Sequence, residues 1–145
     1  MTVLNKQLGY LIARTNRLIE LDLESRLKPD RLTIDHFRVL RCLEQTGPIS
    51  MSELASHVLV EPANLTKIID RMTSQGFVMR LPDQNDRRRV LVTLAPAGKQ
   101  KNSQLADVAK EHEVFVKEML GAEDVEAIRN LLADLQERRE DGTVA

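Results

Sequence analysis

Residues 61–94 read EPANLTKIIDRMTSQGFVMRLPDQNDRRRVLVTL, a helical pattern followed by two strand patterns. The first part predicts a helix over residues 62–75, because Pro62 suits a first helical turn and apolar residues recur at helical spacing. Those apolar residues are Leu65, Ile68, Ile69 and Met72. The opposite face carries no bulky apolar side chain, and Gly76 is placed to end the helix.

A β-hairpin is predicted directly after this helix. Residues 77–81 and 89–94 are rich in strand-forming residues, and in the second run every other residue from Val90 is apolar. The segment between them, PDQNDRR at 82–88, is polar and contains the Pro, Asn and Asp that turns favour. Three consecutive arginines, residues 87–89, lie at the tip of this hairpin.

A second short helix, over residues 51–58, precedes the first. Ser50 and Glu53 have the spacing of a capping box, which predicts that this helix starts after Ser50. Its apolar face consists of Leu54, Ala55 and Val58. Only residues 59–61 separate the two helices, which is the spacing of a helix-turn-helix with the second helix in the recognition role.

A helix with small and hydrogen-bonding side chains, followed by an arginine-tipped hairpin, is suited to duplex DNA. The helix fits the major groove, and the hairpin can reach phosphates or the minor groove. The plain alternative is an exposed helix beside a solvated charged turn. We expect Asn64 and Lys67 to contact bases, because Asn can pair with adenine and Lys with guanine. The other expected DNA contacts are Ala63 in the helix, Thr66, Arg71, Arg87 and Arg89 on the backbone, and Arg88 in the minor groove.

Together these motifs resemble the MarR family of winged-helix transcriptional regulators. The residues that carry the resemblance are Leu54-Ala55, Asp70-Arg71-Met72, Gly76 and Asp86-Arg87-Arg88. The chain departs from the family pattern at Glu61, where Ser or Asp usually caps the helix, and at Leu59, where Gly is frequent. The resemblance implies a repressor that binds DNA as a homodimer and is released by a small aromatic or anionic ligand.

The whole chain predicts a mainly α fold with a small β-hairpin. Long helices are expected over 4–27, 96–120 and 123–139, with a further helix over 34–45 that Thr33 can cap. Ile49 is expected to add a short strand to the hairpin.

We expect one unit over 1–145, with a winged helix-turn-helix core at 33–94 and helical dimerisation regions at 1–32 and 95–145. The long helices have more apolar surface than one small core can absorb, which favours a two-fold dimer on a pseudo-palindromic operator. A monomer whose helices cover the core is the alternative.

Charge is distributed unevenly along the chain, although its formal net charge is only −1. Residues 61–101 hold eight Lys or Arg against four Asp or Glu, and residues 105–145 hold five against eleven. This distribution favours a local binding face for double-stranded DNA. Aromatic residues are only 3%, which argues against binding by base stacking. The alternative function is a winged-helix module whose hairpin binds an acidic protein.

The sequence lacks the motifs of the common enzyme and metal sites. The histidines 36, 57 and 112 are widely spaced, and no HxxxH or CxxC pair occurs, so no metal and no cofactor are expected. No phosphate loop or serine-nucleophile motif is present, and we expect no enzymatic activity. The N-terminus shows no signal pattern and no apolar run is long enough to span a membrane, which predicts a cytoplasmic protein.

An effector cleft is the least specific of these expectations. The resemblance implies a ligand site between the dimer scaffold and the winged helix. Tyr10, Arg14, His36 and Arg38 could border such a cleft. Ordinary packing and surface charge are the alternative role for each of these side chains.

Overall fold

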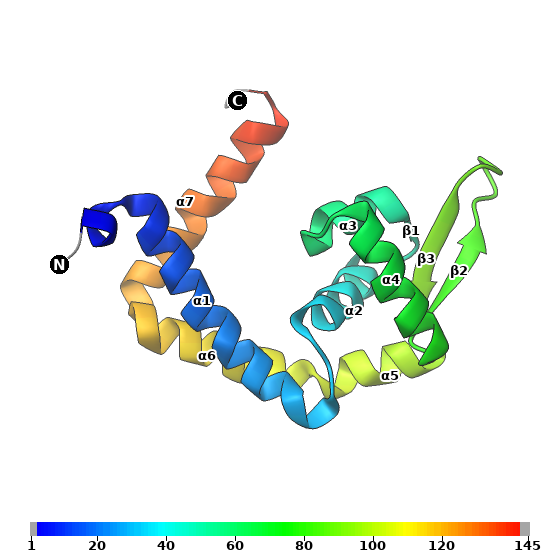
Figure 1. Ribbon diagram of the computed structural model, residues 1–145, viewed down its shortest axis with the longest axis horizontal. Helices are drawn as coiled ribbons and strands as arrows, with labels where there is room; N and C mark the ends of the chain where they lie inside the picture. Colours follow the sequence, from blue (N-terminus) through cyan, green and yellow to red (C-terminus); the bar gives the residue numbers. More distant parts are fainter. Residues whose placement is uncertain (1–2, 143–145) are drawn as a thin grey trace. The chain divides into compact units, whose positions relative to one another are not determined.

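The winged helix-turn-helix elements follow one another as the sequence predicts (Figure 1). A computed structural model of the chain describes residues 3–142. The elements are η1 (Val3–Lys6), α1 (Leu8–Leu27), η2 (Lys28–Asp30), α2 (Ile34–Thr46), β1 (Ile49–Ser50), α3 (Met51–Val58), α4 (Pro62–Ser74), β2 (Val78–Pro82), β3 (Val90–Leu94), α5 (Pro96–Gln104), α6 (Ala106–Leu120) and α7 (Ala122–Glu140). The chain divides into two units, Met1–Val108 and Ala109–Ala145.

A three-stranded antiparallel sheet supports the hairpin, in the order β1-β3-β2. The short strand predicted at Ile49 is confirmed, because Ile49 pairs with Val92 of β3. The hairpin register pairs Val78 with Leu94 and Pro82 with Val90. Since strand side chains alternate between faces, this register puts Val78, Val92 and Leu94 on one face, and all three are buried.

The apolar core of the first unit lies among α2, α3, α4 and the sheet. Its fully buried side chains include Leu40, Leu54, Leu65, Ile69 and Met72. The core also takes in Leu23 and Leu27 of α1 and Leu105 after α5, which lie outside residues 33–94. The winged helix is therefore closed by side chains from both flanking helical segments.

Two of the long helices predicted from the sequence are each broken in two. The helix expected over 4–27 starts only at Leu8, because Gln7 is extended at φ −82° and ψ 125° after the short helix η1. The helix expected over 96–120 is interrupted at Leu105, whose ψ is −1°. No Gly or Pro lies at this break. Leu105 is instead fully buried, so the break coincides with packing in the core.

Helix α5 begins in close contact with the strand region. The Ala95 N–H donates to the Phe77 carbonyl oxygen at 2.9 Å, which holds the end of β3 against the residue before β2. A Cβ at Gly98 would lie 1.9 Å from that same oxygen. Only glycine lets the α5 backbone approach Phe77 this closely.

In the second unit, α7 leaves most of its apolar stripe uncovered. Val125 is its one buried residue. Ile128, Leu131, Leu132 and Leu135 are 38%, 62%, 50% and 40% exposed. Arg129 forms an ion pair with Glu113 of α6, which joins the two helices of this unit. Among residues 3–142, no helix combines the length and apolar character needed to cross a membrane.

Candidate nucleic-acid interface

Helix α4 is anchored through one face and ends in a glycine cap. Leu65, Ile69 and Met72 are fully buried, as the spacing predicts. At the C-terminus, Gly76 has φ +78° and its N–H donates to Thr73 O at 3.0 Å. The Phe77 N–H donates to Met72 O at 2.9 Å, which completes a Schellman cap. This cap fixes where the chain leaves the helix and enters β2.

The face of α4 opposite the core is exposed and polar. Ala63, Asn64, Thr66, Lys67 and Arg71 are all exposed, as a reading face requires. Thr66 Oγ1 donates to Pro62 O at 3.2 Å, so its hydroxyl proton is already used within the helix. Thr66 would have to rotate to donate to a phosphate. Asn64 and Lys67 form no side-chain hydrogen bond or ion pair within residues 3–142 and are available to a ligand.

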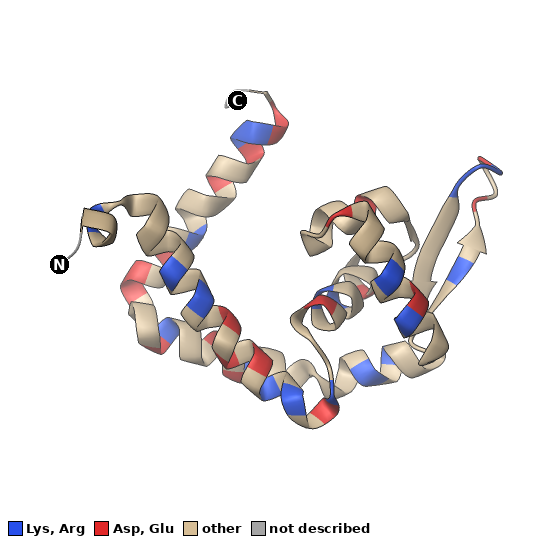
Figure 2. Ribbon diagram, in the orientation of Figure 1, with Lys and Arg blue, Asp and Glu red and all other residues tan. Residues whose placement is uncertain are grey.

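The tip of the hairpin is ordered by aspartates that bind the backbone. Asp83 Oδ1 accepts the Asn85 N–H at 2.9 Å, and Asp86 Oδ1 accepts the Arg88 N–H at 3.0 Å. Arg87 and Arg88 are exposed and form no ion pair with any residue in the described part of the chain. Figure 2 shows basic positions, in blue, in the loop between β2 and β3, with acidic positions, in red, in the same loop.

The other two arginines of the hairpin are held by carboxylates. Arg89 Nη2 lies 2.9 Å from Glu53 Oε1, which joins the start of β3 to α3. Arg80 Nη2 lies 2.5 Å from Asp70 Oδ1, which joins β2 to α4. Arg89 was expected on the DNA backbone, and in the folded chain its guanidinium pairs with Glu53. Neither Glu53 nor Arg80 was predicted to bind an ionic partner in this way.

The turn between α3 and α4 contains a left-handed leucine. Leu59 has φ +65° and is 75% exposed, where the resemblance led us to expect glycine more often. Its N–H donates to Ala55 O at 3.0 Å, so the conformation closes α3. A residue with a Cβ pays a steric cost in this region, and the turn keeps the short helix-turn-helix connection nonetheless.

His36, which was expected beside an effector cleft, is buried. It is 4% exposed, and its ring caps α2. Thr33 Oγ1 accepts the His36 N–H at 3.3 Å and lies 2.6 Å from His36 Nδ1. Nδ1 also accepts the Thr33 N–H, so the ring proton belongs on Nε2. Burial first, and then the positive charge of Arg71, lower the pKa of His36.

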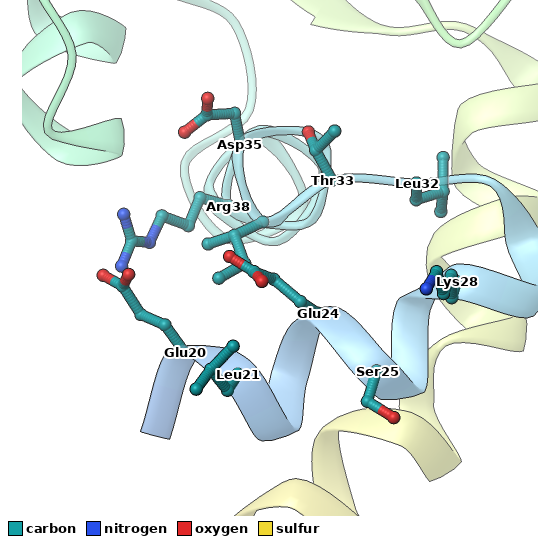
Figure 3. Close-up of a pocket in the computed structure, with 10 residues that line it drawn as sticks. Glu20, Leu21, Glu24, Ser25, Lys28, Leu32, Thr33, Asp35 and Arg38 are labelled. Carbon is teal, nitrogen blue, oxygen red and sulfur yellow. The ribbon is translucent and has the colours of Figure 1, made fainter. Parts of the chain in front are cut away.

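A hollow of about 630 Å³ lies between the C-terminal half of α1 and the start of α2 (Figure 3). We call it the α1–α2 hollow. It is lined by Glu20, Leu21, Glu24, Ser25, Lys28, Leu32, Thr33, Ile34, Asp35 and Arg38. Of the four predicted effector residues, only Arg38 lines it, since Tyr10 and Arg14 lie nearer the start of α1. In Figure 3 the Arg38 guanidinium points toward Glu20.

No cluster of three or more His, Cys, Asp or Glu side chains suited to a metal ion occurs within residues 3–142. Near α4, Asp70 pairs instead with an arginine, and His36 caps α2. The chemistry that this face offers is hydrogen bonding and positive charge.

Known proteins share both the sequence and this arrangement of elements. A model of the MarR family matches residues 32–90. The Multiple antibiotic resistance protein MarR of Salmonella typhimurium is 37% identical over 91 residues, which are 63% of either chain. The crystal structure of apo MarR from Escherichia coli has a TM-score of 0.76 and 31% identity, and the match covers 89% of this chain and 96% of that one. A mutant of the same protein complexed with operator DNA has a TM-score of 0.83 and 30% identity, over 93% and 99% of the two chains.

The chain belongs to the MarR family of transcriptional regulators. The match to MarR extends over nearly the whole of the solved relatives, so it includes the helices that flank the winged helix. The mainly α winged-helix fold expected from the resemblance is confirmed by these structures.

Two ion pairs of this MarR-family chain were not predicted from the sequence. The Glu53–Arg89 pair joins residues 36 positions apart, and no local spacing rule links them. Arg80 and Asp70 are ten positions apart, on either side of the cap at the end of α4. Their pairing depends on the direction in which the chain continues from α4 into β2. The family motif includes both Asp70 and Asp86, but it does not predict that Asp70 pairs with Arg80.

Proposed function

We propose that this protein is a sequence-specific DNA-binding repressor that acts as a homodimer. The observation that carries the proposal is the pairing of an exposed polar face on α4 with a wing tip that presents Arg87 and Arg88 without carboxylate partners among the described residues. The similarity to a MarR structure solved with operator DNA supports it. The proposal assigns no reaction to the chain.

The reading of DNA is divided between helix and wing. Asn64 and Lys67 would contact base edges in the major groove, with Ala63 allowing close approach of the helix. Arg71 and Arg87 would bind phosphates, which fix register without carrying sequence information. Arg88 would enter the minor groove, where a narrow A·T-rich segment attracts arginine.

A homodimer would place two α4 helices on one face of the duplex. The support comes from apolar side chains that each unit leaves uncovered. In the first unit Leu8, Ile12 and Leu18 of α1 are 71%, 59% and 51% exposed. In the second unit Leu131 of α7 is 62% exposed. A two-fold assembly that buries such faces also matches a pseudo-palindromic operator.

The effector that we propose is a small aromatic acid bound in the α1–α2 hollow. Its carboxylate would pair with Arg38, and its ring would lie against Leu21 and Leu32. It would have to compete with Glu20, which points toward Arg38 (Figure 3). Glu20→Gln should therefore tighten binding of benzoate-type acids, measured by calorimetry, and Arg38→Gln should abolish it. Unchanged binding in both variants would remove the hollow as the effector site.

Selection from a random duplex library, followed by affinity measurements at two salt concentrations, tests the DNA proposal. Lys67→Ala should cost about 1–3 kcal/mol and relax the preference at one position in each half-site. Arg88→Ala should weaken binding, reduce the salt slope and alter preference only at A·T-rich flanks.

The same experiment separates DNA binding from the alternative function. If Arg88→Ala binds duplex like the parent at both salt concentrations, the hairpin is not a DNA wing. A winged-helix module that binds an acidic protein then becomes the better assignment. Circular dichroism of both variants should match the parent, because neither side chain is buried.

A further inference from the structure

The wing contains arginines in two different electrostatic settings. Arg87 and Arg88 at the tip form no ion pair within residues 3–142. Arg89, directly before β3, has Glu53 Oε1 2.9 Å from Nη2 and Asp83 Oδ2 4.0 Å from Nε. Arg87 and Arg88 thus lack a carboxylate partner among the described residues, whereas Arg89 lies between two carboxylates. A phosphate approaching Arg89 meets one guanidinium and two carboxylates.

Glu53 is held in this position by more than Arg89. Its Oε1 also accepts the Ser50 Oγ–H at 3.0 Å, and its N–H donates back to Ser50 Oγ at 3.3 Å. Glu53 lies in the first turn of α3, where the positive end of the helix favours an anion. The carboxylate therefore occupies a place, beside a serine hydroxyl, a helix start and an arginine, that would also suit a DNA phosphate.

We propose that Glu53 sets the affinity of the wing for DNA by withholding Arg89 from the phosphate backbone. The inference rests on the proposed DNA-binding function, and Glu53 acts in it as a positioning residue, through Arg89. The two side chains are 47% and 53% exposed, so the pair contributes little net stability and a phosphate can compete for Arg89. Base contacts made by α4 are not affected by this competition.

The consequence is a lower sequence-independent affinity for duplex DNA. Phosphate contacts contribute to every sequence alike, whereas base contacts contribute only at the operator. A wing with one arginine withheld binds random duplex more weakly and leaves α4 a larger share of the binding free energy. Removal of the Glu53 charge should therefore raise the affinity for random duplex and for the operator by a similar factor.

Glu53→Gln tests this directly, because the amide oxygen can still accept from Ser50 while the charge is lost. Affinity for a random-sequence duplex is measured between 50 and 200 mM salt. The log–log salt slope should become steeper by about one unit per wing, which adds a roughly three- to fourfold larger loss of affinity over that range for each wing. Arg89→Ala should change the parent little and should cancel the gain in the Glu53→Gln background.

Glu61→Gln is the matched control. Glu61 is the N-cap residue of α4, makes no side-chain cap bond and forms no ion pair within the described residues. Its replacement removes the same charge near the proposed DNA face but releases no arginine. The effect of Arg89→Ala should therefore be the same in the Glu61→Gln background as in the parent.

The outcomes distinguish two roles of the Glu53–Arg89 pair, which either withholds Arg89 from DNA or anchors the wing. If Glu53→Gln weakens binding as much as Arg89→Ala does, the pair anchors the wing and the inference is overturned. An unchanged salt slope in Glu53→Gln also overturns it, provided that the parent binds duplex. If the parent shows no salt-dependent binding to any duplex, the proposed function itself fails. Thermal melting of the variants verifies that all remain folded.

Discussion

Helices α4 and α7 have the same kind of apolar stripe but opposite surroundings. Leu65, Ile69 and Met72 of α4 are fully buried by their own unit. In α7, Leu131 and Leu135 repeat at the same i, i+4 spacing and are 62% and 40% exposed. Helical periodicity therefore identifies which face of a helix is apolar. It does not say whether the surface that covers this face belongs to the same chain.

The difference also separates two kinds of stability. The burial of α4 is a property of one folded chain and does not depend on protein concentration. If a second chain covers α7, its burial follows mass action and increases with concentration. Mutations in the two helices should accordingly act on different measurable quantities.

The largest effect is expected from Leu131→Asp combined with Leu135→Asp. Two charges on the exposed stripe of α7 should prevent dimerisation, and loss of the second recognition helix should weaken operator binding by about 100- to 10,000-fold. Sedimentation and operator affinity are the measurements. A dimer that still binds operator would remove these residues from the interface.

The control for that experiment adds the same charge to the other side of α7. Asn130→Asp combined with Ala133→Asp also introduces two carboxylates, at exposed positions away from the stripe. This variant should sediment as a dimer and bind operator like the parent. Loss of the dimer here as well would point to net charge, and not to the apolar stripe, as the cause.

A smaller effect is expected in α4, and on the folding of the single chain. Leu65→Ala removes a fully buried side chain and should lower the free energy of unfolding by about 2–5 kcal/mol in urea. Leu131→Ala, measured at concentrations where the chain is monomeric, should change it by less than about 0.5 kcal/mol. Equal losses in both variants would mean that α7 is covered within the monomer.

Leu59 is also an exposed leucine, but it lies in the turn between α3 and α4 and not on an apolar stripe like that of Leu131. Its φ of +65° is favourable for glycine, so Leu59→Gly should stabilise the chain by about 0.5–1 kcal/mol. Leu59→Ala removes the apolar side chain but keeps the strain, and should give no such gain. Neither variant should change the dimer. Equal stabilisation by both would attribute the effect to the exposed side chain.

The smallest expected effect concerns pH and the surroundings of α4. Burial and Arg71 lower the pKa of His36 below its ordinary value of 6.5, so folding favours the neutral ring. This stabilisation is complete above about pH 6.5 and is lost as the pH falls from there through the folded-state pKa. His36→Gln keeps an acceptor for the Thr33 N–H but does not titrate.

Urea midpoints between pH 7.5 and 5 provide the measurement for His36. The parent should lose stability over that range relative to His36→Gln, and His57→Gln, at an exposed histidine of α3, should behave like the parent. Parallel pH profiles for the parent and His36→Gln would show that another group is responsible. No corresponding pH effect is expected from the α7 stripe, which carries no titratable side chain.

The sequence was most informative where neighbouring residues determine the structure. The apolar spacing from Leu65 to Met72, the position of Gly76 and the polar turn after Pro82 predict α4, its end and the hairpin, and the structure has all three. Each depends on contacts within a few residues or on the conformational preference of one residue. The family motif adds the winged-helix fold and DNA as the proposed partner.

The misses depend on contacts between distant residues. Nothing local interrupts the pattern at Leu105, where burial in the core of the first unit accompanies the break between α5 and α6. The burial of His36, which was not predicted, depends on how α2 packs near Arg71 of α4 and near Gln75. The Glu53–Arg89 pair required the wing to fold back beside α3.

The close approach at Gly98 limits how this protein can vary. A Cβ there would lie 1.9 Å from the Phe77 carbonyl oxygen, which is backbone and cannot rotate away. Even alanine must push α5 off the strand region or break the bond from Ala95 to that oxygen. In a saturation mutagenesis experiment, position 98 should therefore accept fewer substitutions than large core positions such as Leu40. A single hydrogen atom in place of a side chain thus fixes where the wing ends and the long C-terminal helices begin.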